Sequence, residues 1–362
     1  MMQNTASEAL VTQLSAQLGD VFLTENISVR GDGRVVAFVG QLLRDAESTF
    51  VILEQRFKKL GYLPILRKIK GQDTILVTPA PAEKGGSRLI INLLLFLATV
   101  CTVVLGGALQ EGYNPLEDSP IVLLTGIPFA FALLSILGTH ELAHFLVARA
   151  RGMKATLPYF IPIPFSPLGT FGAVIKMESP IKDRKMLFDV GISGPLAGLV
   201  VSIIALVVGL RLSEGTVPPP GDASVMPLGT GILVDWITNL VLGPLPDHLM
   251  VILHPIAFAG WFGIFVTAMN LIPISQLDGG HVGYAFFGEA HRWVAALIFV
   301  GLLLMSVVWT GWLFWGFFIF VFGGLRHPPP LNDITPLDTK RKLLAIFAFA
   351  LLFLLGTPRP FG

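Results

Sequence analysis

The stretch LGTHELAHFLVARARG, residues 137–152, places two histidines and a glutamate in one of the most apolar parts of the chain. Charged groups inside an apolar helix cost about 2.5–3.5 kcal/mol each on insertion scales, so polar groups kept there point to a function. His140 and His144 are four residues apart, and on a helix their side chains stack on one face. A metal ion can sit between the two imidazoles, and Glu141 can reach a metal-bound water as general base, as in the H-E-x-x-H arrangement of zinc hydrolases. The alternative is a buried polar network between packed helices.

The composition around this stretch predicts a polytopic membrane protein. Of the 362 residues, 53% are hydrophobic and only 14% are charged, whereas a typical soluble domain is about 25% charged. Apolar runs such as RLIINLLLFLATVCTVVLGGAL exceed the roughly 18 residues that mark a transmembrane helix. The net charge of +1 implies no bulk attraction to nucleic acid, and a single cysteine, Cys101, excludes an intrachain disulfide.

We expect six or seven transmembrane helices, near residues 88–108, 120–150, 186–211, 251–275, 292–309, 310–325 and 343–356. The segment 156–177 contains four prolines and cannot form a regular helix. Its end, GTFGAVIKM, is typical of a strand. Because non-helical backbone at membrane depth is tolerated only beside protein or water, this segment predicts a re-entrant or interfacial loop next to a cavity.

The first 85 residues are more polar and predict a small soluble α+β domain. Residues 34–40 favour a strand, residues 45–61 a helix, and residues 62–79 a hairpin that turns near Lys70. Residues 79–87 are typical of a linker. The predicted fold is thus an all-α polytopic membrane protein with an added α+β domain, divided into residues 1–85 and residues 86–362, with a core at 120–290.

The distribution of basic residues predicts the orientation of the chain. With the amino end inside, the inner segments 1–88, 149–185, 281–292 and 326–342 hold 23 of the 25 lysines and arginines. Inner loops are enriched in lysine and arginine in membrane proteins. We therefore expect the α+β domain on the cytoplasmic side, or on the equivalent side of another membrane.

A catalytic zinc site normally has three protein ligands, so a third one is needed from elsewhere. Asp278, in NLIPISQLDGGH near the end of another apolar segment, offers a carboxylate oxygen, and Gly279 and Gly280 let the backbone approach closely. It is favoured partly on the resemblance described below. His281 is the rival. The other histidines, His248, His254, His291 and His327, sit in expected loops or at boundaries, and Asp189 is interpreted as a helix-start residue or a partner of a ligand.

The chain resembles the site-2 protease family of intramembrane zinc metalloproteases, peptidase family M50. The resemblance rests on HELAH at 140–144, FDVGISGPLAG at 188–198 and NLIPISQLDGG at 270–280, in the family's order. The sequences of the segments GTFGAVIKM and DRKMLFDV are most similar to those of the family branch found in plastids, cyanobacteria and other bacteria. The resemblance implies one Zn²⁺ per chain held by His140, His144 and Asp278, with Glu141 as general base. It also implies that Asn270 polarises the scissile carbonyl; alone, an asparagine in an apolar segment is as often a hydrogen-bonding contact between helices.

The resemblance further implies regulated intramembrane proteolysis of membrane-protein substrates, often single-pass and already cut once, in a lipid bilayer and without nucleic acid. The expected location is a bacterial cell membrane or a thylakoid or plastid membrane. Two alternatives use the same polar residues: a metal or ion transporter, and a non-catalytic membrane scaffold. A transporter usually shows repeats and several midplane acids, and neither is evident in the sequence.

Overall fold

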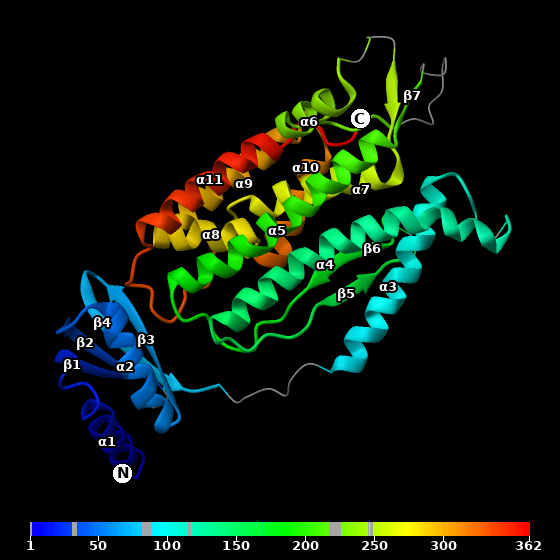
Figure 1. The fold of residues 1–362 in the computed structure, drawn as a ribbon. Coiled ribbons are helices and arrows are strands. Elements are labelled where there is room, and N and C mark those ends of the chain that lie inside the picture. The colour runs from blue at the N-terminus through cyan, green and yellow to red at the C-terminus, as the bar shows by residue number, and fades with distance from the viewer. Residues whose placement is uncertain are drawn as a thin grey trace. The chain divides into compact units, whose positions relative to one another are not determined.

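The computed structural model describes residues 2–30, 35–81, 88–114, 117–164, 166–216, 226–244, 246 and 249–362. It contains two compact units (Figure 1). The first, here called the sheet unit, comprises Met1–Gly85, Pro180–Leu187 and Pro328–Asp338. The second, the helical unit, comprises Gly86–Ser179, Phe188–His327 and Thr339–Gly362. Most of the expected linker, and His248, lie outside the described residues.

The sheet unit is a four-stranded antiparallel sheet with two helices. Its elements are α1 (Met2–Ser15), β1 (Phe22–Arg30), β2 (Val35–Leu42), α2 (Ala46–Lys59), β3 (Tyr62–Ile69) and β4 (Gln72–Pro79), with strand order β1-β2-β4-β3. The side chain of Asp45 caps α2 by accepting a hydrogen bond from the Ser48 amide at 2.8 Å. Lys70 and Gly71 form the hairpin turn with φ values of 51° and 84°. The strand, helix and hairpin expected here are therefore confirmed.

Two segments from far along the chain complete the sheet unit. The Leu66 amide in β3 donates to the Leu331 carbonyl at 2.8 Å, and the Asn332 amide donates to the Lys182 carbonyl at 2.7 Å. Residues around 331 and 182 thus extend the sheet beyond β3, and Leu331 joins the core that contains Phe38. The sheet unit therefore includes these two segments in addition to the first 85 residues.

Ion pairs join the added segment Pro180–Leu187 to helix α2. Lys182 pairs with Glu54 at 2.8 Å and Lys185 pairs with Glu47 at 2.6 Å. Both acids lie on α2, so this segment, which includes the first turn of α5, is anchored by side chains as well as by backbone.

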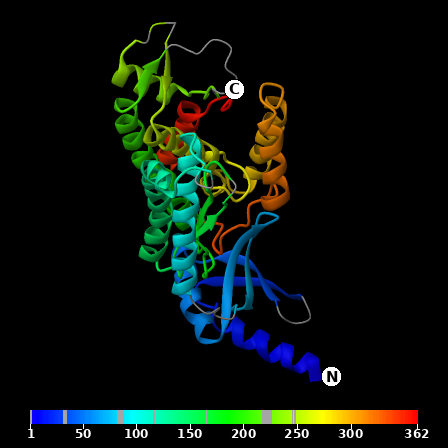
Figure 2. The same ribbon diagram turned by 90° about the vertical axis from the view of Figure 1, so that its right-hand side faces the viewer.

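The helical unit is built mainly of apolar helices. Its elements are α3 (Leu89–Gln110), η1 (Pro120–Gly126), α4 (Ile127–Ala150), β5 (Tyr159–Pro162), β6 (Thr170–Val174), α5 (Arg184–Arg211, whose first four residues belong to the sheet unit), β7 (Glu214–Thr216), α6 (Ile232–Leu242), β8 (Met250–Ile252), α7 (Pro255–Leu271), α8 (Asp278–Phe287), η2 (Gly288–Ala290), α9 (His291–Met305), α10 (Gly311–Gly323) and α11 (Thr339–Leu355). Helix α4 packs against both α3 and α7, and α9 packs along α10 (Figure 2).

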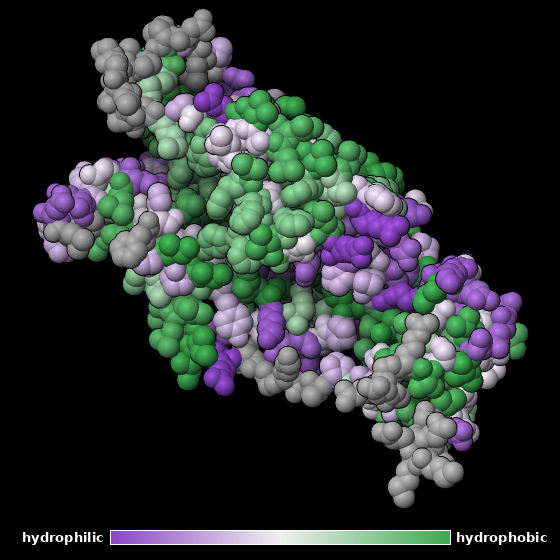
Figure 3. All heavy atoms as spheres, turned by 180° about the vertical axis from the view of Figure 1, so that it is seen from behind, coloured by the Kyte–Doolittle hydropathy of each residue, from purple (hydrophilic) through white to green (hydrophobic). Residues whose placement is uncertain are grey.

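Four helical stretches among the described residues are long and apolar enough to cross a membrane. They are Leu89–Gln110, Pro120–Ala150, Arg184–Arg211 and Asp278–Met305, the last combining α8, η2 and α9. A continuous hydrophobic surface covers much of the helical unit in Figure 3, which suits contact with lipid rather than water. Within the described part of the chain, three further apolar helices have only 10–17 residues, so the expected count of six or seven spans is not confirmed.

Of two local structures near the site, one differs from what the sequence predicted and the other agrees with it. The expected helix at 251–275 ends at Leu271, and a loop with Pro273 leads into α8. Asp278 therefore begins a helix instead of ending one, and residues 281–287 are helical where a loop was expected. The strand expected near 171–177 is confirmed, because β6 pairs with β5 in an antiparallel hairpin.

Candidate metal centre

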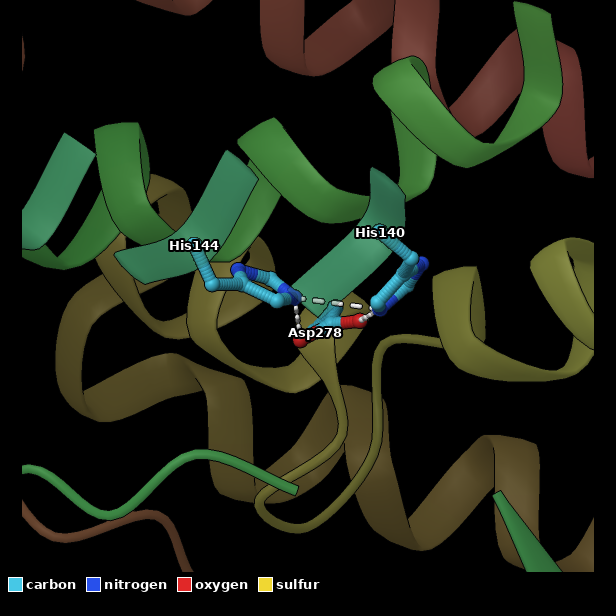
Figure 4. A group of neighbouring side chains, drawn as sticks. All are labelled: His140, His144 and Asp278. Carbon is cyan, nitrogen blue, oxygen red and sulfur yellow. Dashed lines mark hydrogen bonds and ion pairs between the residues drawn. The ribbon is translucent and has the colours of Figure 1, made fainter. Parts of the chain in front are cut away.

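Three side chains from two helices converge on one point (Figure 4). His140 and His144 project from α4, and Asp278 projects from the first turn of α8. The two histidine Nε2 atoms are 3.1 Å apart, and they lie 3.2 Å and 3.3 Å from the two carboxylate oxygens of Asp278. Among the described residues this is the one cluster of three such groups that could hold a metal ion.

The spacing and chemistry of this cluster fit a zinc ion. Ligand atoms about 2.0–2.2 Å from zinc in a tetrahedral arrangement lie about 3.3–3.5 Å apart, which is close to the three observed distances. Two imidazoles and one carboxylate are also a common donor set for a catalytic zinc with an open fourth position. The ring nitrogens and carboxylate oxygens face one another here. A cation between them would therefore give each of the three buried polar side chains a partner.

A backbone carbonyl fixes the orientation of His144. Its Nδ1 atom donates a hydrogen bond to the Val190 carbonyl in α5 at 2.7 Å, so Nε2 is left with a lone pair directed into the cluster. The hydroxyl of Ser193 donates to the same carbonyl at 2.8 Å. Hydrogen bonds of this kind to the second ring nitrogen hold metal-binding histidines in the required tautomer.

Glycines of α5 form the wall behind the two histidines. A methyl group on the α-carbon of Gly194 would lie 2.1 Å from Nε2 of His144, and one on Gly198 would lie 3.3 Å from Nδ1 of His140. One on Gly191 would lie 2.7 Å from the Cβ atom of His281. The absence of side chains at these positions allows α5 to approach α4 and α8 at the cluster.

The two glycines that follow Asp278 have a comparable role. Methyl groups on Gly279 and Gly280 would lie 2.1 Å and 2.3 Å from the carbonyl oxygens of Leu271 and Ser275. The loop that precedes α8 is therefore wrapped tightly around its first turn, and Ser275 adopts a left-handed φ of 58° within it. This close wrapping fixes the backbone from which Asp278 projects.

Glu141 lies beside the cluster and is buried. Its carboxylate lies beside the backbone amide of Ile175, the residue directly after β6. The β5–β6 hairpin is thus adjacent to the predicted general base. Sequence reasoning could not identify Ile175, because the contribution comes from its backbone and carries no residue signature.

The other predicted residues lie outside the cluster. Asn270 is half-buried at the penultimate position of α7, and no hydrogen bond among the described residues joins it to the three ligands. The Nδ1 atom of His281 lies 2.6 Å from Nε2 of His327, so the rival ligand is paired elsewhere. Asp189 does not start α5: it is ion-paired with Arg151 and Arg341 inside the helical unit.

The part of the chain that holds the cluster is similar to a known protein family. The sequence profile of peptidase family M50 matches residues 128–308, half of the chain, and includes both histidines and Asp278. The chain belongs to peptidase family M50. Among curated M50-like relatives, it is 30% identical over 374 residues to the probable zinc metalloprotease EGY1, chloroplastic, of Oryza sativa subsp. japonica, covering 90% of this chain and 63% of that protein.

Two relatives from Arabidopsis thaliana give a similar picture. The chain is 32% identical to the probable zinc metalloprotease EGY1, chloroplastic, of Arabidopsis thaliana, over 74% of this chain and 53% of that protein. It is 31% identical to the probable zinc metalloprotease EGY2, chloroplastic, over 77% of this chain and 49% of that protein. The chain therefore spans about half to two-thirds of the length of these relatives. No solved structure matches it significantly.

Proposed function

We propose that this M50 chain is an intramembrane zinc endopeptidase that cleaves peptide bonds within or next to transmembrane segments of other membrane proteins. The observation that carries the proposal is the convergence of His140, His144 and Asp278 beside the buried Glu141. The relatives' names support it, because they are described as zinc metalloproteases.

In this proposal His140, His144 and Asp278 hold the zinc ion. Bound zinc would activate water and polarise a carbonyl group. Glu141 accepts the proton of the attacking water and returns it to the leaving amine, since its carboxylate is adjacent to the ligand His140. Asn270, whose role is taken from the family resemblance, donates to the carbonyl oxygen of the scissile bond.

The β6 strand is the proposed binding site for an unwound substrate. The Lys176 carbonyl accepts a hydrogen bond from the Thr156 amide, so the backbone groups of Lys176 face Thr156. Because neighbouring residues of a strand direct their backbone groups to alternate sides, those of Ile175 and Ala173 face the opposite side. That side carries the Ile175 amide, which contacts Glu141. A substrate strand added there would lie next to the general base, and main-chain hydrogen bonds would replace those of its unwound helix.

We further propose a multi-pass arrangement of six or seven spans with the sheet unit on the cytoplasmic or equivalent side. The basic residues support this orientation, because 23 of 25 fall in the predicted inner segments. The relatives are described as chloroplastic, which supports a plastid membrane or the related membrane of a bacterium. The proposed substrates are membrane proteins, often single-pass and already cut once.

Glu141→Gln tests the proposed activity. We expect it to retain stoichiometric zinc and to lower substrate cleavage at least ~100-fold, the usual range for loss of a general base. Comparative membrane proteomics should then show single-pass fragments that accumulate. Glu111→Gln, at an exposed position after α3, is the matched control.

The same variant separates the alternatives. Cleavage that survived in Glu141→Gln would contradict the protease proposal. Loss of zinc flux into proteoliposomes, with cleavage absent in both proteins, would favour a transporter. A scaffold would show neither activity in the wild type.

A further inference from the structure

The carboxylate of Asp189 joins three helices of the helical unit. We propose that Asp189 is a positioning residue for the metal ligand His144, that it acts through the neighbouring carbonyl of Val190, and that Arg341 and Arg151 hold it in place. The inference rests on the proposed function, because it concerns the ligand geometry of the same metal centre.

The contacts of Asp189 are short and directional. The Nε atom of Arg341 in α11 donates to its Oδ1 at 2.7 Å, and Nη2 of the same arginine donates to Oδ2 at 2.8 Å. Arg151, at the end of α4, donates to the same Oδ2. The Asp189 side chain is 17% exposed and that of Arg341 is 23% exposed. Two-point arginine–carboxylate pairs fix relative orientation as well as distance.

The link to the metal centre runs through one peptide unit. Val190 follows Asp189 directly, and its carbonyl accepts the hydrogen bond that fixes the tautomer of His144. On α4, Arg151 lies seven residues after His144, which is two turns along the same face. The seam, meaning the line of contact between α4 and α5, therefore contains two contacts. They are the Arg151–Asp189 ion pair and, nearer the metal centre, the His144–Val190 hydrogen bond.

Elsewhere in the seam, the hydroxyl of Ser193 lies 3.4 Å from Nδ1 of His144, a longer contact than those of Asp189. Gly194 and Gly198 allow the two helices to approach closely, but glycines do not oppose rotation or sliding. A change of one residue in helical position is a rotation of about 100°, so a much smaller turn of α5 would carry the Val190 carbonyl away from Nδ1 of His144. The Asp189 ion pairs, with Arg151 in this seam and with Arg341 on α11, oppose such a turn.

A plain stabilising role for the same ion pairs makes a different prediction. If the pairs only hold α5 to α4 and α11, removing them lowers the unfolding temperature of the metal-free protein and leaves the affinity of the folded protein for zinc unchanged. If they position His144, zinc affinity falls even where the metal-free protein remains folded.

The experiment measures the zinc dissociation constant of the full-length protein in detergent by competition with a chromophoric chelator. For Asp189→Asn and Arg341→Gln we expect binding about tenfold weaker than wild type, the lower end of the range for residues that orient ligands. Arg341→Lys keeps one charged contact and should recover part of the affinity. Arg56→Gln, which removes another two-point pair, with Asp20 in the sheet unit, is the matched control and should bind zinc like wild type.

Two further readouts make the result decisive. The visible absorption of the Co²⁺-substituted protein should change in Asp189→Asn, because it reports ligand geometry, and the unfolding temperature in excess chelator should stay within a few degrees of the control. Wild-type zinc affinity in both Asp189→Asn and Arg341→Gln would overturn the inference and leave the proposed function standing. A wild-type protein that bound no zinc would overturn the proposed function and this inference with it.

Discussion

A methyl group on the α-carbon of Gly194 would lie 2.1 Å from the Nε2 atom of His144. This distance is far below van der Waals contact, so α5 packs directly against the nitrogen proposed to bind zinc and leaves no room for a side chain at Gly194. Helix packing and metal binding are thus set by the same pair of residues.

Gly194→Ala is expected to abolish stoichiometric zinc binding, because either the His144 ring must rotate away or α5 must retreat from α4. Metal analysis of the purified protein measures the effect. Gly138→Ala on α4 is the control: nothing lies within 4 Å of the added methyl group, and alanine stabilises a helix over glycine by about 1 kcal/mol. Zinc retained at one equivalent in Gly194→Ala would contradict the assigned ligand geometry.

Asp278→Ala and His281→Ala compare the two candidates for the third ligand. We expect Asp278→Ala to weaken zinc binding at least ~100-fold, because one of three ligands is lost. His281→Ala should retain zinc, because its ring pairs with His327. Chelator competition gives both affinities, and the reverse order of effects would assign the ligand to His281.

Ala173→Pro tests strand addition at β6. Proline removes the backbone donor on the side that carries the Ile175 amide, so kcat/KM for a membrane substrate should fall at least ~10-fold. Zinc content should stay at the wild-type value, because Ala173 lies in β6 and the three proposed ligands lie on α4 and α8. Ala173→Val keeps the donor and suits a strand, and it serves as the control. Unchanged cleavage by Ala173→Pro would exclude pairing at this position.

Asn332→Ala should destabilise the sheet unit by about 2–4 kcal/mol, since several buried backbone groups lose a partner. The Asn332 side chain donates to the Ala46 carbonyl and accepts from the amides of Ile334 and Thr335. Hydrogen–deuterium exchange should show faster exchange across β3 in the full-length protein. Asn239→Ala, at an exposed position on α6, should leave that exchange unchanged. Unaltered exchange of β3 in Asn332→Ala would mean that the segment does not support the sheet.

The surface pair of Asp20 and Arg56 gives a pH dependence. The hydrogen bond from Arg56 lowers the pKa of the Asp20 carboxyl from 3.8 to about 2. Because the folded-state pKa is below the unfolded value, the stabilisation is present above about pH 4 and disappears as the pH falls towards 2. The gap in unfolding temperature between wild type and Asp20→Asn should therefore be small and constant near neutral pH and should close in acid. A gap that widened below pH 4 would contradict this sign.

The sequence predicted those parts of the molecule that have a local signature. The four-residue spacing in HELAH and the glycines after Asp278 indicated which side chains to bring together, and the structure brings His140, His144 and Asp278 within ligand distance. The capped helix α2 and the hairpin at Lys70 followed from capping and turn chemistry. Each of these features depends on residues close together in the chain.

The features that sequence did not predict depend on contacts between distant segments. Asp189 was interpreted as a helix-start residue or a partner of a ligand, and nothing local reveals that Arg341 lies against it. The end of α7 at Leu271 was missed because the apolar run continues past it, although Pro273 interrupts the helix. The contribution of Ile175 to Glu141 comes from a backbone amide and is invisible in the residue type.

The contact between Arg67 and Leu331 has a consequence for biosynthesis. The two residues are 264 positions apart, yet Arg67 donates to the Leu331 carbonyl at 2.9 Å, and Leu331 belongs to the first unit's core. At about 5–20 residues per second, a ribosome needs roughly 13–50 seconds to travel that distance. During this interval the open edge of β3 is a template for pairing with other chains. The strands of this sheet are thus synthesised before the helices that follow them, but the sheet is completed only when Leu331 arrives, and the edge of β3 stays open until then.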